Sequence, residues 1–436
     1  MGRTTSVAAY LTVIGIVAGR LLTAGGGAAT TAPRAAPEVT VAPAGSDNLA
    51  QLEATLTKNP NDLTTLQTLA VDYVRRAAYG DPSYYDLARR ALARAFKVSP
   101  GNDVTFVAKG VLELSLHQFG EALAIGQRVH RDNPNLDDDY AVLVDASVEL
   151  GHYRDAQRYI QELVDRHPGL PAYARVSYFR ELHGDDNGAV SAMQLAIAAG
   201  AGVPSDVGSV TELLGDVQFA RGDLRDAGSD YTQALRLIPN LPLAELGLAK
   251  VEAAQGKVLA AVDRLTKLTN VYPLPQAVGV LGDLQMRLGR TADAQQSYAL
   301  VGAIASLQHR SGQVTDLEMA QFQLDHGQIA LGTSTADAAY KARPDNVYVD
   351  DVMAWARYRH GDFRGAQHYE IQALRIDGSD AMLHYHEATI EAALGDRTAA
   401  TAQLRFALHE NPWFSFAIRN QIAHLAESLG VPFAAW

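Results

Sequence analysis

Cysteine is absent from all 436 residues of this chain. That absence excludes disulfides, thiolate metal sites, iron–sulfur clusters, a cysteine nucleophile and lipid attachment through sulfur. Positive charge is scarce as well, because 37 Lys and Arg face 49 Asp and Glu, for a formal net charge of −12. Nucleic acids and anionic lipids attract clustered basic side chains, so the composition argues against nucleic acid as a partner.

Short catalytic motifs are missing too. The chain has no GxxxxGK[ST] phosphate-binding loop, no GxSxG nucleophile elbow and no HExxH zinc motif. No segment outside the repeats described below is long enough to form a catalytic domain. We therefore expect a protein that is not an enzyme and needs no cofactor.

The amino-terminal segment, residues 1–24, has the parts of an export signal or a membrane anchor. Arg3 precedes an apolar run from Val7 to Ala18, and small residues follow it. An uncleaved anchor and a cleaved signal both fit, the first with Arg20 at the membrane surface. Residues 25–47 are rich in Ala, Gly, Pro and Thr and predict a disordered linker. We expect a membrane-anchored chain with an extracytoplasmic remainder, or a secreted one; a cytoplasmic location is the alternative.

Hydrophobic residues make up 47% of the chain, enough to bury a core. Its length would ordinarily indicate two or three domains. Residues 48–430 instead repeat at intervals of 33 to 38 residues, which is the signature of a repeat architecture. The repeat is marked by a ladder of small residues: Ala88, Ala122, Ala156, Ala189, Ala227, Ala261, Ala294, Ala330, Ala366 and Ala400.

The pattern of each repeat predicts two amphipathic helices. A glycine five residues before most of the ladder alanines permits the turn between the helices, and a proline twelve residues after six of them ends the second helix. The alanine lies where the two helices come closest. One such pair cannot bury its apolar faces alone, so the pairs must stack into a solenoid.

This pattern resembles the tetratricopeptide repeat family, and the resemblance covers roughly Asn48 to Gly430. It implies an all-α, right-handed α-solenoid of about ten helix-turn-helix repeats. A capping helix is expected at about 414–429, followed by a tail at 431–436, and we expect a bacterial member of the family. The stretch from Ala299 to Ala342 departs most from the pattern, with Asp337 in place of a small residue. The match is best in one repeat, at Leu214, Gly215, Ala227, Tyr231, Ala234 and Pro239.

In this family the first helix of each pair lines the concave face. Counting back from the ladder alanines predicts a groove that is acidic in its middle and aromatic towards its carboxyl end. Such a groove suits an extended, basic protein segment with apolar anchors. The alternative is that the acids are merely solvated and the aromatic residues are core. The predicted groove residues are Asp138, Asp145, Glu149, Glu181, Glu212, Asp216, Asp283, Phe219, Phe322, Tyr348, Trp355, Tyr358 and Tyr385.

Histidines gather late in the chain, with six of the thirteen after Arg359. His384 and His386 are two apart, which places them on opposite sides of a helix, so they do not bind one ion together. We expect surface and core-edge histidines and no metal, and a metal site assembled across neighbouring repeats is the open alternative.

Taken together, these features predict a protein–protein interaction scaffold that is tethered to a membrane through its amino terminus or exported. Two alternatives stay open: a cytoplasmic regulator or adaptor, and an accessory subunit of an enzyme. The sequence does not name the partner or determine the oligomeric state.

Overall fold

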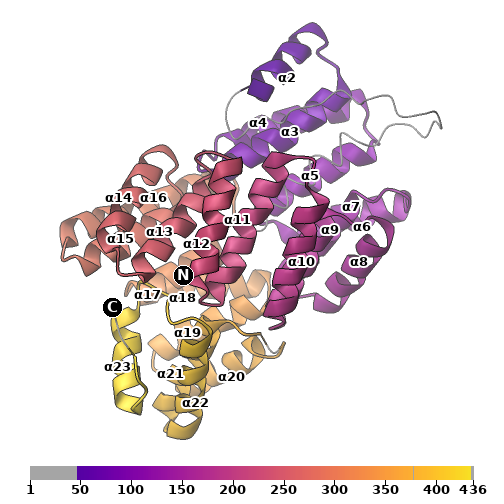
Figure 1. Cartoon of the computed structure of the whole chain (residues 1–436). Helices are drawn as coiled ribbons and strands as arrows, with labels where there is room; N and C mark the ends of the chain where they lie inside the picture. The colour runs from indigo at the N-terminus through magenta and orange to yellow at the C-terminus, as the bar shows by residue number, and fades with distance from the viewer. Residues whose placement is uncertain (1–46, 377, 434–436) are drawn as a thin grey trace.

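The computed structural model describes residues 47–376 and 378–433. Within these residues the chain forms 22 α-helices and no strand (Figure 1). Ten antiparallel helix pairs follow one another from α3 to α22, with one further helix at each end, so the fold is an all-α solenoid as expected. The helices are α2 (Asp47–Lys58), α3 (Leu63–Ala78), α4 (Tyr84–Val98), α5 (Asp103–Ser115), α6 (Phe119–Asp132), α7 (Asp139–Glu149), α8 (Tyr153–Arg166), α9 (Leu170–Leu182), α10 (Asp186–Ala199), α11 (Pro204–Ala220), α12 (Leu224–Leu237), α13 (Pro242–Ala254), α14 (Val258–Val271), α15 (Pro275–Arg287), α16 (Thr291–Arg310), α17 (Asp316–Asp325), α18 (Ile329–Ala342), α19 (Val347–Arg359), α20 (Phe363–Ala373), α21 (Ala381–Leu394), α22 (Arg397–Glu410) and α23 (Arg419–Leu429).

The alanine ladder lies where the paired helices touch. Nine of its ten members are fully buried, each with 0% of its surface exposed. A larger side chain at these points would push the two helices apart, because protein interiors are packed without spare volume. The nine are Ala88, Ala122, Ala156, Ala189, Ala227, Ala261, Ala294, Ala366 and Ala400.

The tenth member, Ala330, is exposed, and the expected register in this repeat is wrong. The ladder position belongs to Gly332, which is buried and whose added Cβ would lie 2.7 Å from Leu324 Cγ. Asp337, expected in place of a small residue, lies exposed instead. The shift has a simple cause: α16 has 20 residues, whereas α14 and α18 have 14 each, so the spacing on both sides of it is irregular.

Glycines permit similar close approaches between repeats. Tyr231 on α12 is fully buried, and its hydroxyl donates a hydrogen bond of 2.6 Å to Asp216 Oδ1. A Cβ on Gly215 of α11 would come within 2.7 Å of the Tyr231 ring, and a Cβ on Gly247 of α13 would overlap that ring. The aromatic side chain therefore fills the space that two neighbouring helices leave open.

The solenoid winds back on itself, so that repeats far apart in sequence lie side by side (Figure 1). Residues at or near the turn between the two helices of an early repeat contact the segment that precedes a later repeat. The contacting residues are 192 to 198 positions apart in the sequence. Four hydrogen bonds of 2.9 Å join successive turns of the superhelix: Val314 N to Leu116 O, Asn346 Nδ2 to Glu149 O, Ser379 Oγ to Asp186 Oδ2, and Asn411 Nδ2 to Phe219 O.

The expected membrane-anchored or secreted location is wrong on the present finding. Across the described part of the chain, no helix combines the length and the apolar character needed to cross a bilayer. Residues 1–46, on which the expectations of an anchor or signal and of most of the linker fall, lie outside the described residues.

The carboxyl-terminal helix begins at Arg419, later than the expected start near Phe414. Phe414 lies in the preceding turn, only 5% exposed, with its ring 5.5 Å from that of Tyr385. Asn411 caps this turn by accepting a hydrogen bond of 2.7 Å from Trp413 N. The segment therefore packs on α21 before α23 begins.

Candidate functional site

The thirteen predicted groove residues are mostly buried. Nine of them expose less than a tenth of their surface, and the other four are half-buried. Whether any of them contacts a partner stays a prediction. The buried nine are Asp145, Glu149, Glu181, Glu212, Asp283, Phe322, Tyr348, Trp355 and Tyr385, and the half-buried four are Asp138, Asp216, Phe219 and Tyr358.

Asp145 forms an ion pair with Arg175 of the same chain. Arg175 Nε donates to its Oδ1 at 2.9 Å, and Arg175 Nη2 donates to its Oδ2 at 2.7 Å. Both side chains are nearly inaccessible, and the two-pronged geometry joins α7 to α9. Burial raises the pKa of Asp145 and the guanidinium opposes that rise. Its charge therefore stabilises the contact between neighbouring repeats.

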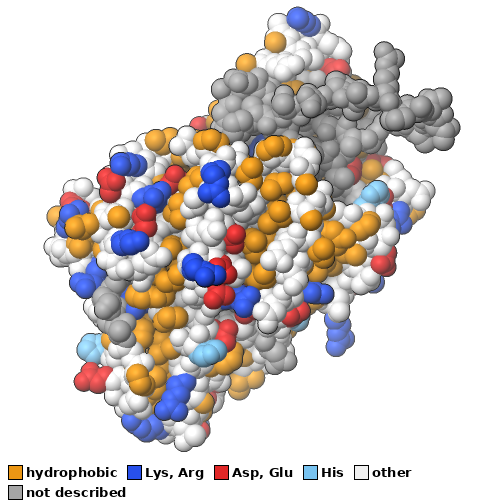
Figure 2. Space-filling view, in the orientation of Figure 1, with side chains coloured by type: hydrophobic (Ala, Val, Ile, Leu, Met, Phe, Trp, Pro, Cys, Tyr) orange, Lys and Arg blue, Asp and Glu red, His pale blue; other side chains and the backbone are white. Residues whose placement is uncertain are grey.

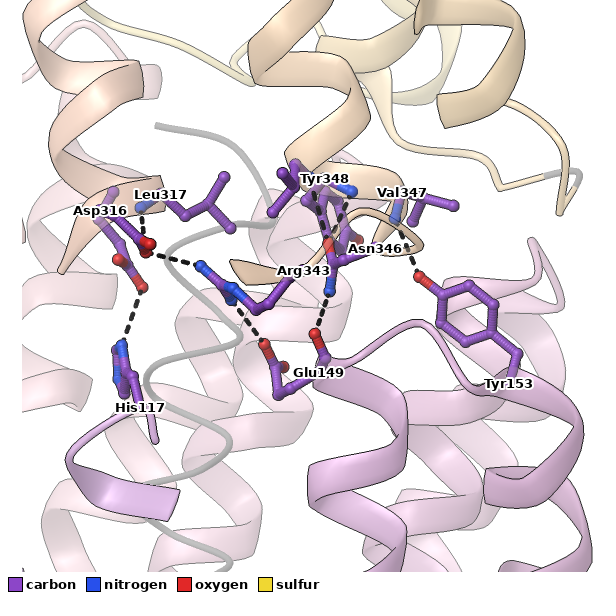
Figure 3. A network of polar contacts seen from close by, with 11 residues as sticks. His117, Glu149, Tyr153, Asp316, Leu317, Arg343, Asn346, Val347 and Tyr348 are labelled. Atoms are coloured by element: carbon purple, nitrogen blue, oxygen red, sulfur yellow. Dashed lines mark hydrogen bonds and ion pairs between the residues drawn. The ribbon is translucent and has the colours of Figure 1, made fainter. Parts of the chain in front are cut away.

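Glu149 belongs to a polar network at the junction between turns of the superhelix (Figure 3). Arg343 Nη1 lies 3.3 Å from Glu149 Oε2, and Arg343 Nη2 donates to Asp316 Oδ1 at 2.8 Å. His117 lies at the same junction, 4.0 Å from Glu318. Burial raises the pKa of Glu149 to about 8, and Arg343 opposes the rise. One arginine thus links the end of α7 to the start of α17.

Asn346 is the second link in this network. Its side chain donates to the backbone oxygen of Glu149 at 2.9 Å, and it accepts hydrogen bonds from Tyr348 N and Val349 N at the start of α19. Tyr153 OH accepts a further bond of 3.0 Å from Val347 N (Figure 3). The residue that caps α19 therefore also satisfies the carboxyl end of α7.

Glu212 and Asp216 form a second acidic group, on α11. Both oxygens of the Glu212 carboxylate are buried without a hydrogen-bond partner, and Asp216 accepts from Tyr231. Burial, and after it the neighbouring Asp216 charge, raise the pKa of Glu212 well above its usual range. A third acid, Asp283, accepts from His326 Nε2 at 2.8 Å and from Tyr298 OH at 3.0 Å.

Two of the predicted aromatic residues, Trp355 and Phe322, pack against other rings of the chain. The Trp355 ring stacks on Tyr358 at 5.0 Å and on His386 at 4.2 Å between ring centres. The Trp355 indole nitrogen donates to Asp325 Oδ1 at 3.1 Å. Phe322 lies edge-on to Tyr298 at 5.9 Å. This cluster has the burial and the partners of core residues.

The two histidines of α21 have separate environments. His384 lies 2.8 Å from Gln403 Oε1 through Nδ1 and 3.0 Å from Gly378 O through Nε2. His386 is fully buried, and its Nδ1 lies 2.6 Å from Asp351 Oδ1. Asp351, Glu370 and His386 bring one donor atom each to within 4.8 Å of one another. They form a group with the composition of a metal site.

An exposed surface of a different composition lies on α16, the second helix of its pair. Figure 2 shows apolar and charged side chains interspersed over the face that carries α10 and α11. On α16 the interspersed charge stops, because no residue from Ala294 to Gln308 is charged or a histidine. Leu300 and Leu307 of this helix are 43% and 48% exposed. We call Gln296, Leu300, Ala303 and Leu307, all exposed, the α16 stripe.

The sequence-based prediction missed the α16 stripe and the junction residues Arg343 and Asn346. The uncharged run 294–308 was visible in the sequence as a signal for the stripe. For the junction no local signal exists, because its partners lie almost two hundred residues apart.

No protein-family model and no curated protein matches this chain. Among solved structures, it is similar to the human IFIT1 dimer with PPP-AAAA, with 15% identity, a TM-score of 0.47, and coverage of 76% of this chain and 77% of that one. A tetratricopeptide repeat protein from Parabacteroides merdae has 17% identity and a TM-score of 0.35, over 62% of this chain and 98% of that one. Yeast Tom70 has 11% identity and a TM-score of 0.36, over 86% and 96%. Similarities this distant say nothing about the function of this chain.

Proposed function

We propose that this chain is a non-enzymatic scaffold that binds a protein partner, and that the α16 stripe is a principal contact surface. The observation that carries the proposal is the uncharged, solvent-facing side of α16. An exposed helix of a soluble protein normally places charged or strongly polar side chains on its outer face. An outer face without charges favours contact with another apolar surface.

The stripe has the spacing of one helix face. Leu300, Ala303 and Leu307 follow Gln296 at intervals of four, three and four residues, so all four side chains project in nearly the same direction. The side of the helix next to the stripe carries Val301 and Ile304, which are buried. From Gln296 to Leu307 the stripe extends about 16 Å, at a rise of about 1.5 Å per residue.

The occupant that best fits this surface is one amphipathic helix of a protein partner. A length of three turns matches the apolar side of a short helix, and recognition of that kind uses anchors at i, i+4 and i+7. The lack of charge on the stripe disfavours a basic or acidic segment, which would lose hydration there without gaining an ion pair. The partner is therefore expected to present Leu, Ile, Met or aromatic side chains.

The test compares the unmodified chain with a Leu300→Glu, Leu307→Glu double variant. Each protein is immobilised and used to capture partners from an extract of the source organism, and each captured protein is purified and its affinity measured by calorimetry. Burying the two leucines more fully is worth about 2 kcal/mol, so the double variant should bind about 30-fold more weakly or not at all.

The matched control adds the same two charges elsewhere. Leu331 on α18 and Ile371 on α20 are 53% and 58% exposed, on helices that already carry charged side chains. A Leu331→Glu, Ile371→Glu variant should bind as the unmodified chain does. Identical capture and affinity for all three proteins, with unchanged circular dichroism, would refute the role of the stripe.

The predicted groove remains a second candidate for the contact surface, with an extended basic segment as its occupant. The observation that favours it is the Glu212 carboxylate, which has no hydrogen-bond partner and lies beside Asp216. A partner cation there would offset the cost of a buried acid beside a half-buried one. Salt separates the candidates: binding through acids weakens as ionic strength rises, whereas binding through the α16 stripe does not.

A further inference from the structure

Three side chains from consecutive helices meet at a fully enclosed point between the ninth and tenth helix pairs. Asp351 lies on α19, Glu370 on α20 and His386 on α21. Their exposed fractions are 1%, 0% and 0%, and one donor atom of each lies within 4.8 Å of the others. The group is independent of the α16 stripe, and its His386 stacks on Trp355, one of the predicted groove residues.

Several polar atoms of these side chains have no hydrogen-bond partner within the described chain. Both oxygens of the Glu370 carboxylate are buried without a hydrogen-bond partner, and so is Nε2 of His386. Within the described chain, a hydrogen bond joins His386 Nδ1 to Asp351 Oδ1 at 2.6 Å, and the Glu370 carboxylate lies beside that of Asp351. Burying a polar atom without a partner costs about 1–3 kcal/mol, and a carboxylate costs more. Three such atoms in one enclosed group indicate that something binds there.

The surrounding charges do not neutralise the group. Within residues 47–376 and 378–433, neither Asp351 nor Glu370 forms an ion pair with Lys or Arg. Arg375, the cation of the neighbouring α20 turn, lies 2.6 Å from Asp350 instead. Glu387, next to His386, adds another carboxylate with a buried, unpartnered oxygen. Two ligand carboxylates and an imidazole therefore match the charge of a divalent cation.

The ligand types narrow the choice of ion. Magnesium and calcium prefer oxygen ligands alone, whereas imidazole with carboxylates suits zinc, manganese or iron. Two ligands at about 2.1 Å from an ion can lie at most about 4.2 Å apart, and the donor atoms of this group all lie within 4.8 Å of one another. The group therefore has nearly the dimensions of a site for one ion.

We propose that Asp351, Glu370 and His386 bind one divalent transition-metal ion that ties the last two helix pairs together. Complete burial makes this a structural site, filled as the repeats fold. The competing occupant is a proton shared between the two carboxylates, because neighbouring buried acids are also satisfied in that way.

The test uses the full chain without a histidine tag. The protein is unfolded with a chelator, refolded by dialysis with Zn²⁺ or Co²⁺, freed of excess ion by gel filtration, and analysed for metal by mass spectrometry. One ion per chain is expected. Bound Co²⁺ should also quench the fluorescence of Trp355, whose ring centre lies 4.2 Å from that of His386.

Two variants assign the ion to this site. Glu370→Gln keeps the shape of the side chain and should weaken Zn²⁺ binding by at least about 100-fold, more than the loss of an outer partner costs. Glu212→Gln is the matched control, because Glu212 is also a buried, unpartnered carboxylate beside another acid, with no histidine in its group. It should retain one ion per chain.

The proposal is overturned if the folded, unmodified chain holds no stoichiometric Zn²⁺ or Co²⁺, since the group then holds a proton. It is also overturned if Glu370→Gln binds Zn²⁺ with the affinity of the unmodified chain. Circular dichroism shows whether each variant is folded. Should Glu370→Gln fail to fold, His386→Gln with the Trp355 quenching measurement gives the same comparison.

Discussion

Replacing Asn346 by alanine measures how strongly successive turns of the superhelix hold one another. The Asn346 side chain is 3% exposed and makes two kinds of contact. It caps α19 by accepting from Tyr348 N at 2.9 Å, and it donates to Glu149 O at 2.9 Å across the junction. Asn346→Ala removes both contacts.

The two losses can be sized separately. A lost amino-terminal cap costs about 1 kcal/mol. The Glu149 oxygen lies at the carboxyl end of α7, where backbone oxygens have no partner within the helix. Leaving it buried without a donor costs about 1–3 kcal/mol more. We therefore expect Asn346→Ala to lower the free energy of unfolding by about 2–4 kcal/mol.

The assay is equilibrium unfolding in urea, followed by circular dichroism. Asp362 supplies the matched control, because it caps α20 by accepting from Gly365 N at 2.9 Å and is exposed, without a junction contact. Asp362→Ala should cost only the cap, about 1 kcal/mol. The difference between the variants is the contribution of the junction.

Equal losses for Asn346→Ala and Asp362→Ala would refute this reasoning. The chain would then behave as a linear array in which each repeat is stabilised only by its neighbours. A larger loss for Asn346→Ala, with one cooperative transition, supports a superhelix whose turns stabilise each other.

Two further predictions concern packing and charge. Gly247→Ala should lower the free energy of unfolding in urea by about 1–3 kcal/mol, because the added Cβ overlaps the Tyr231 ring. Gly228→Ala is the control: its Cβ makes only an ordinary contact at 3.5 Å, so this variant should raise the free energy of unfolding by up to about 1 kcal/mol. Equal effects of the two variants would contradict the packing argument. The folded pKa of Glu149 is raised to about 8 from 4.5, so its contribution to stability is full below pH 4.5 and is lost as the pH rises to 8. Urea unfolding between pH 5 and 8 measures how steeply the free energy of unfolding falls with pH. Glu149→Gln should reduce that slope by up to about 1.4 kcal/mol per pH unit. An unchanged slope would count against a protonated Glu149.

The sequence alone determined the class of fold and most of its register. Small residues recur where paired helices must approach closely, and this constraint is local to one repeat. Nine ladder alanines could therefore be placed correctly without a structure. The tenth, Ala330, was misplaced because α16 is longer than its neighbours. The spacing of small residues does not reveal that a helix has extra turns.

Only the tertiary structure showed which of the predicted groove residues are buried and what they contact. Helical periodicity assigns a residue to a face of its helix, but it does not say what covers that face. Asp145 and Glu149 were predicted on the concave side, and their arginine partners come from α9 and from the linker after α18. The second of these partners depends on how tightly the superhelix winds.

The proposed metal group likewise depends on both local and tertiary structure. The sequence showed that His384 and His386 point apart, because residues two positions apart on one helix diverge by about 200°. It did not show that Asp351 and Glu370 approach His386, since that meeting requires three helices at fixed crossing angles. Local periodicity thus decided which helices form and which faces they bury, whereas the winding of the solenoid decided which distant side chains meet.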